Sequence, residues 1–284
     1  MRPIKTQLIS HGAGTINEDI AQLNPSSAWI LDGATGLSEK NIIDNESDAR
    51  WFVQQWNEYL SAAVEDCDKS VADLIKAGIP IIKNKYYGLS KGADPQPIDL
   101  PSSGVALVRW NEEKLDYLVL GDCILIIKYA GNKISVVKDD CLQQLDEKAI
   151  DRLHQLMIES NYSFEDAIQE INPILVSHRL MKNTQAGYWI LGFDEQALDN
   201  CIHAAADIKE ISEIVLMSDG FAALIDKYHY TDESKIFDEV NHKGLASLYA
   251  TLRQTELDDI EVKKYPRLKK SDDASAIAVC FSAV

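Results

Sequence analysis

The amino-acid sequence predicts an α+β fold in which antiparallel sheets are covered by helices. Apolar residues form short β-branched runs in some segments and recur every three or four residues in others, which are the patterns of strands and helices. The strands follow one another in groups, and the helices come in pairs. This order differs from the regular alternation of a parallel α/β fold and favours antiparallel sheets.

Seven short apolar runs predict strands. They cover residues 29–31, 104–110, 117–127, 133–137, 188–191, 213–217 and 276–281. Gly121 and Asp122 divide the third run, and Gly131 and Asn132 precede the fourth. Because glycine with Asp or Asn is typical of tight turns, these segments are expected to form a meander of hairpins.

Four amphipathic patterns predict helices, the first of them after the capping residues Ser47 and Asp48. Pro173 is expected to kink or end the third helix, and Gly244 weakens the fourth. The apolar positions are, in order, Ala49, Phe52, Val53, Trp56, Leu60 and Val64; Ile150, Leu153 and Met157; Phe164, Ile168, Ile171 and Leu175; and Phe237, Val240, Leu248 and Leu252. Residues 88–103 and 257–273 have irregular patterns but not the composition of a domain linker, so residues 1–284 are predicted to form one domain.

Composition excludes several classes of protein. With 28 basic and 45 acidic side chains the net charge is −17, which argues against binding to nucleic acids or anionic membranes. Anionic substrates remain possible, because a bound divalent cation can reverse the local sign of the charge. The five cysteines include no C-x-x-C pair, and no signal peptide or membrane span is evident. These features predict a cytoplasmic protein with reduced thiols, which we expect to be monomeric.

Acidic residues lie where several predicted strands begin or end. Any one Asp-Gly pair is typical of a turn, but their repetition suggests that the carboxylates converge at one edge of the sheets. Such a cluster needs cations to offset the repulsion between like charges, and hard oxygen ligands favour Mg²⁺ or Mn²⁺. The segments are Asn17-Glu18-Asp19, Asp32-Gly33, Gly121-Asp122, Ser218-Asp219-Gly220 and Asp272-Asp273.

This series resembles the ordered motifs of protein phosphatase 2C-type, metal-dependent serine/threonine phosphatases, in a bacterial-like variant, from about residue 10 to residue 281. The resemblance implies an αββα sandwich, with two antiparallel sheets between pairs of helices. It also implies a binuclear Mn²⁺ or Mg²⁺ centre that Asp32 bridges, with the Gly33 carbonyl as a further ligand. Glu18 and Asp19 would bind one ion directly or through water, Asp219 and Asp272 would complete the other, and Asp122 would hold a weaker third.

The activity implied is hydrolysis of phosphoserine and phosphothreonine in signalling phosphoproteins, by attack of a metal-bridging water or hydroxide that Asp32 and Asp219 help to hold. Three positions depart from the family pattern: Gly14 replaces a phosphate-binding Arg, Ala34 replaces a His found in some members, and Ala223 replaces a third-metal Asp. A substitute phosphate ligand could come from Arg179, the candidate we name, from Lys182, or from the lysines of residues 263–270. The variable flap is expected at about residues 142–182, as two helices.

Two alternatives follow from these departures. The chain could be a catalytically weak, phosphatase-like regulatory module, or it could hydrolyse a small phosphorylated metabolite. The motif register assigns Asp272 to the metal, with Asp273 at a position where the family usually has Asn.

Overall fold

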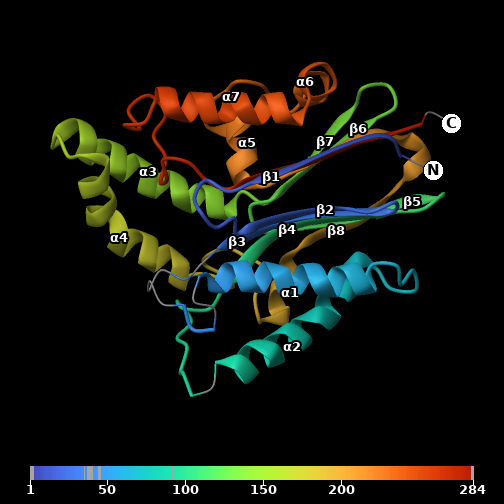
Figure 1. The fold of residues 1–284 in the computed structure, drawn as a ribbon, viewed down its shortest axis with the longest axis horizontal. Coiled ribbons are helices and arrows are strands. Elements are labelled where there is room, and N and C mark those ends of the chain that lie inside the picture. Colours follow the sequence, from blue (N-terminus) through green and yellow to red (C-terminus); the bar gives the residue numbers. More distant parts are fainter. Residues whose placement is uncertain (1–2, 35, 37–40, 44–45, 91, 283–284) are drawn as a thin grey trace.

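The computed structural model describes residues 3–34, 36, 41–43, 46–90 and 92–282. Its centre consists of two five-stranded sheets packed face to face, with antiparallel neighbours throughout (Figure 1). One sheet has the order β1 (Pro3–His11), β10 (Ala274–Phe281), β9 (Ile211–Met217), β6 (Ile124–Tyr129) and β7 (Ile134–Val137). The other has the order β2 (Asp19–Leu23), β3 (Ser27–Ala34), β4 (Ser102–Trp110), β5 (Lys114–Leu120) and β8 (Ile202–Asp207).

Helices cover both outer faces of this pair of sheets (Figure 1). The helices α1 (Asp48–Ala63) and α2 (Val71–Leu89) lie on the sheet that contains β3, and α5 (Asp219–Asp226), α6 (Ile236–Lys243) and α7 (Leu245–Asp258) lie on the sheet that contains β10. Two short 3₁₀ turns, Glu195–Asn200 and Ile208–Glu210, flank β8. The predicted αββα sandwich is therefore confirmed.

Strand β3 shows why the apolar runs of this sequence are continuous. Successive side chains of a strand point to opposite faces, so Ala28 and Ile30 pack between the sheets while Trp29 and Leu31 pack under α1 and α2. All four side chains are fully buried. A strand covered on both faces thus has no polar side to present, in contrast to the alternating pattern of a half-exposed strand.

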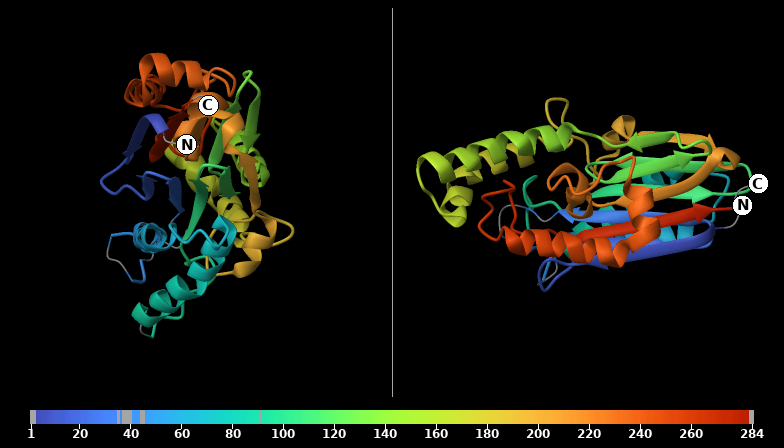
Figure 2. Two further views of the ribbon diagram at one scale, coloured as in Figure 1. Left: turned by 90° about the vertical axis from the view of Figure 1, so that its right-hand side faces the viewer. Right: turned by 90° about the horizontal axis from the view of Figure 1, so that it is seen from above.

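The helices α3 (Cys141–Glu159) and α4 (Phe164–Leu180) form a hairpin at one end of the sandwich (Figure 2). We call this pair the α3–α4 hairpin; it occupies the region predicted as the flap. It has a small core of its own, consisting of Ala149, Leu153, Leu156, Ala167 and Ile171. A second small cluster around Leu145, Tyr188 and Ile190 lies where the hairpin joins the sandwich.

Several local predictions were wrong. Residues 188–191 make only isolated bridges, from Tyr188 to Lys182 and from Leu191 to Ser103. Gly244, at a φ of 81°, separates α6 from α7 where one helix was expected. Pro173, which was expected to kink or end its helix, lies inside α4 and does not end it. No strand was predicted at β1, β2 or β8, and none of the four helical patterns covers α2 or the short helix α5. Within the described residues, no helix combines the length and the apolarity required to cross a bilayer.

Candidate active site

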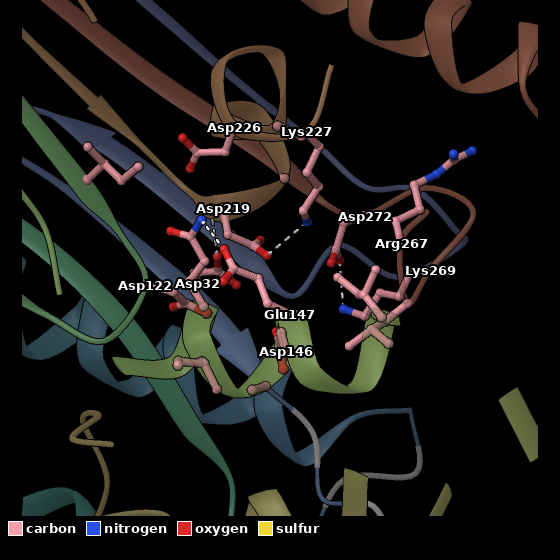
Figure 3. Close-up of a pocket in the computed structure, with 18 of the residues that line it drawn as sticks. Asp32, Asp122, Asp146, Glu147, Asp219, Asp226, Lys227, Arg267, Lys269 and Asp272 are labelled. Atoms are coloured by element: carbon pink, nitrogen blue, oxygen red, sulfur yellow. Dashed lines mark hydrogen bonds and ion pairs between the residues drawn. The ribbon is translucent and has the colours of Figure 1, made fainter. Parts of the chain in front are cut away.

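The predicted acidic residues converge at the end of the sandwich where β3 and β9 finish. Asp19 begins β2 and lies directly opposite Asp32 of β3 in the antiparallel register. Asp219 follows β9 as the first residue of α5, and its backbone N–H donates to Oδ2 of Asp32 at 3.3 Å, which joins the two sheets. Asp122 follows β5, and Asp272 precedes β10. Figure 3 shows Asp32, Asp122, Asp219 and Asp272 gathered in one place.

Glycines at two strand positions make this close approach possible. Gly33 follows Asp32, and a Cβ on it would lie 2.5 Å from the carbonyl oxygen of Glu18. Gly104 of β4 lies opposite Asp32, and a Cβ on it would lie 2.5 Å from Oδ1 of Asp122. The absence of a side chain at Gly104 therefore leaves the space that the Asp122 carboxylate fills.

A cavity of about 470 Å³ opens beside these carboxylates. Asp32, Gly33, Asp122, Asp219 and Asp272 line it on the side of the sheets. The opposite walls come from α3, α4, the end of α5 and the segment of residues 266–272 (Figure 3). The volume is that of a small-molecule site or of a phosphorylated side chain, and it is walled partly by the α3–α4 hairpin.

Burial and mutual repulsion raise the pKa values of the clustered acids. Burial is the main cause for Asp19 and Asp122, whose pKa values are raised to about 7, with a further contribution from the Asp219 charge. The pKa of Asp32 lies well above its ordinary value because of burial and then the charges of Asp19 and Asp219. Burial also raises the pKa of Asp272, although the neighbouring Lys269 opposes the shift. The cluster therefore lacks enough positive charge to hold all its carboxylates ionised.

Asp19 provides the sharpest test of whether a divalent cation fits here. Only 2% of its surface is exposed, and neither carboxylate oxygen accepts a hydrogen bond of normal geometry. The hydroxyls of Ser218 and Ser275 lower the pKa of Asp19, but they do not offset its burial. An oxygen-seeking cation would satisfy this carboxylate. In the part of the chain that the structure describes, no three His, Cys, Asp or Glu side chains are already arranged as a metal site. The carboxylates would therefore have to draw together around an ion.

The two neighbouring acids Asp272 and Asp273 have different surroundings. Asp272 lines the cavity and forms an ion pair with Lys269. Asp273 turns the other way, and its carboxylate accepts from the backbone N–H groups of Ala13 at 2.8 Å and Glu18 at 2.6 Å. Asp273 thereby attaches the loop that carries Glu18 to the start of β10. The Glu18 carboxylate itself accepts from the hydroxyl of Ser47, the N-cap of α1.

Comparison with solved structures identifies the fold. The serine/threonine phosphatase PstP of Mycobacterium tuberculosis matches with a TM-score of 0.58 at 14% identity, over 98% of this chain and 98% of that one. Stp1 of Staphylococcus aureus matches at 0.54 and 12%, over 98% and 95% of the two chains, and the PPM phosphatase MsPP of Mycobacterium smegmatis at 0.52 and 12%, over 99% and 100%. The chain has the PPM phosphatase fold. No family model matches the sequence, and no curated protein matches it significantly.

Two residues that sequence reasoning missed also face the acids of this PPM fold. Lys227, at the C-terminal end of α5, places Nζ 3.8 Å from Oδ2 of Asp219. Burial would lower the pKa of Lys227, but the carboxylates of Asp219, Asp272 and Asp146 raise it, so its ammonium stays charged. Asp146 of α3 lines the cavity, and burial together with Asp219 raises its pKa to about 6. Lys227 lies eight positions after Asp219, on the same side of α5, so a prediction of this short helix could have found it.

The substitute phosphate ligands named from the sequence are dispersed in the structure. Arg179 of α4 lines the cavity, with Nη1 3.4 Å from the hydroxyl of Ser102. Lys182 instead donates to the carbonyl of Leu100, and burial and the Arg179 charge lower its pKa to about 7. Within residues 263–270, Lys269 is the lysine that contacts the acid cluster, at 2.8 Å from Asp272. Lys263 pairs with Glu261, and Lys270 pairs with Glu165.

The three departures from the family pattern lie in different surroundings. Ala34 and Ala223 line the cavity, where a larger side chain would contact its contents. Gly14 lies in the exposed loop before Glu18, and a Cβ on it would meet nothing within 4 Å. A side chain at position 14 thus has room, so the glycine is not required by close packing.

Proposed function

We propose that this protein is a metal-dependent hydrolase that removes phosphate from phosphoserine and phosphothreonine in protein substrates. The observation that carries this proposal is the buried carboxylate of Asp19, whose oxygens accept no hydrogen bond of normal geometry, opposite Asp32 at the point where acids from both sheets converge. The structural neighbours support it, because they are serine/threonine phosphatases with the same fold.

In this proposal two groups of residues would each hold one cation. Gly33, Glu18 and Asp19 would hold one ion, Asp219 and Asp272 would hold the other, and Asp32 would contribute to both. Asp122 is available for a weaker third ion. Bound Mn²⁺ or Mg²⁺ would supply the activated water for in-line attack and neutralise the phosphoryl oxygens. The neighbouring strands position these residues, and α3 and α4 contribute walls of the cavity beside them.

Arg179 remains our sequence-based candidate for binding the substrate phosphate, and its position in the cavity wall supports this role. The alanine at position 34 supplies no proton donor for the leaving group. We therefore expect esters with good leaving groups, such as aryl phosphates, to be hydrolysed faster than alkyl phosphoesters.

One alternative is a regulatory module that binds phosphoproteins without turnover. Ala34 and Gly14 favour this alternative, since both lack side chains that a catalytic site could use. The buried acid cluster favours the enzyme, because a surface made only for binding has no evident use for carboxylates whose pKa values are raised by burial. A phosphatase of small metabolites would share the metal site and differ only in substrate.

The deciding experiment measures hydrolysis of p-nitrophenyl phosphate with Mn²⁺, with Mg²⁺ and with excess EDTA. We expect turnover that requires metal, and a loss of roughly a thousandfold in Asp219→Asn, equivalent to about 4 kcal/mol of transition-state stabilisation. Asp32→Ala should behave in the same way. Asp238→Asn, an exposed change on α6, serves as the matched control.

Equal activity of Asp219→Asn and the unaltered chain would refute the metal assignment. Binding of Mn²⁺ without turnover would favour the regulatory module.

A further inference from the structure

We propose that Lys227 and Lys269 together form the phosphate clamp of the active-site cavity. This proposal rests on the proposed phosphatase function and names residues that bind its substrate group. The two lysines come from separate elements, Lys227 from the end of α5 and Lys269 from the segment before β10. Figure 3 shows both side chains directed toward the acids, Lys227 toward Asp219 and Lys269 toward Asp272.

The other cations that the structure describes in the cavity form no ion pair with the acids proposed as metal ligands. Lys138 pairs with Asp140 at 3.0 Å, and Arg179 reaches Ser102. The guanidinium of Arg267 points away from the acids (Figure 3) and forms a buried ion pair with Asp259 at 2.8 Å. Among the described residues that line the cavity, Lys227 and Lys269 are therefore the cations paired with the acids proposed as metal ligands.

This placement matches the needs of a phosphate dianion. The ammonium groups lie 3.8 Å from Asp219 and 2.8 Å from Asp272. A phosphoryl group bound to cations at these acids would therefore be near both lysines. A phosphoryl group there has oxygens beyond those that two ions can bind, and a lysine ammonium is a compact point charge suited to them. Gly14, in the loop before Glu18, offers no side chain that could bind a phosphate.

The segment that carries Lys269 is held firmly on both sides. Arg267 is buried, with 3% of its side chain exposed, and donates to Asp259 and to backbone carbonyls. Asp259 in turn accepts from the N–H groups of Lys263, Lys264 and Tyr265. The backbone next to Lys269 is thus positioned before any ligand arrives, which reduces the entropy lost on binding.

The test measures binding of inorganic phosphate by calorimetry to protein saturated with Mn²⁺, together with its inhibition of aryl phosphate hydrolysis. We expect Lys227→Gln and Lys269→Gln each to weaken phosphate binding by at least tenfold, and the double variant by about a hundredfold. Affinity for Mn²⁺ should stay the same or increase, because a cation next to the acids is removed. Lys138→Gln and Lys270→Gln are the matched controls, and each should change phosphate affinity less than twofold.

Three outcomes would overturn the clamp. The first is unchanged phosphate binding in the double variant, even if hydrolysis by the unaltered chain confirms the phosphatase. The second is a parallel loss of Mn²⁺ affinity, which would mean that the lysines only arrange the acids. The third is absence of phosphate binding by the unaltered chain. If the unaltered chain hydrolyses nothing yet binds phosphate through these lysines, the proposed function fails while the clamp stands.

Discussion

One end of the sandwich carries Asp19, Asp32, Asp122, Asp219 and Asp272, and we call it the acid end. The acid end and the α3–α4 hairpin line one cavity, yet they are built differently. Asp32 lies within a sheet, with Asp19 opposite it on β2 and Gly104 opposite it on β4. The hairpin packs around a separate small core and joins the sandwich through few side chains. The difference teaches that the acids proposed as metal ligands are placed at strand ends, where hydrogen bonds of the sheets hold the backbone, while the opposite wall of the cavity has a core of its own.

The largest effect should come from breaking the core of the hairpin. Leu153 is fully buried there, and Leu153→Ala should cost the hairpin about 2–5 kcal/mol. Because few other residues hold this core, we expect α3 and α4 to lose protection in hydrogen exchange while β3 and β9 keep theirs. Hydrolysis of a small aryl phosphate should fall only a few-fold, whereas KM for a phosphopeptide should rise more.

Leu248→Ala on α7 is the matched control. Leu248 is equally buried, but it packs in the cluster between the helices α5–α7 and the sheet that contains β10. This variant should lower protection throughout the sandwich. Loss of protection in β3 after Leu153→Ala would show that the hairpin and the acid end form one cooperative unit, and the contrast between them would fail.

The sequence predicted the acid end better than its surroundings. Asp32 and Asp219 stand out because each comes at the end of a short apolar run and next to a glycine, and the strands β3 and β9 carry them to one end of the sandwich. The role of Gly104 could not be identified, because it depends on contact with Asp122, which follows the next strand, β5. Lys227 was missed because α5 is only 8 residues long and too short for a clear helical period.

The edges of the fold were also hidden in the sequence. Strand β8 is largely exposed, and three of its six residues are alanine, so it lacks the run of β-branched residues that marks a buried strand. Strand β1 alternates irregularly because it is the edge of its sheet. The two helices of the flap were predicted from their periods, but their packing against residues 266–272 depends on tertiary contacts, such as that of Leu268 with the hairpin core.

A smaller effect concerns how the free energy of unfolding depends on pH through the buried carboxylate of Asp19. Burial raises the pKa of Asp19 from 3.8 to about 7, so the folded protein holds a proton that the unfolded chain releases between about pH 4 and pH 7. The free energy of unfolding of the metal-free protein should therefore fall as the pH rises through this range. Asp19→Asn should weaken this dependence and raise Tm in EDTA at pH 8 by several degrees, since about 1 kcal/mol corresponds to roughly 2–4 °C in domains of about 150–250 residues.

Thermal unfolding in EDTA and in Mn²⁺, from pH 5 to pH 8, measures this effect. Mn²⁺ should stabilise the unaltered chain most at high pH and stabilise Asp19→Asn much less. Asp238→Asn, on the surface of α6, is the control and should follow the unaltered chain. A metal-free protein that becomes more stable from pH 5 to pH 8 would mean that the acid end carries no excess of negative charge.

The smallest effect should come from the ion pair between the hairpin and the segment that precedes Asp272. Lys270 Nζ lies 2.6 Å from Glu165 Oε1, with 40% and 63% of the two side chains exposed. Exposed pairs of this kind contribute about 0.2–1 kcal/mol, and salt weakens them.

A double-mutant cycle with Lys270→Gln and Glu165→Gln, read by hydrogen exchange in α4, should give a coupling in this range that shrinks in high salt. Lys270 also lies over the ring of Phe164, so its replacement should cost slightly more than that of Glu165. A coupling well above 1 kcal/mol, with altered Mn²⁺ affinity, would mean that movement of the hairpin reaches Asp272, and that the substrate wall and the chemical site are not independent.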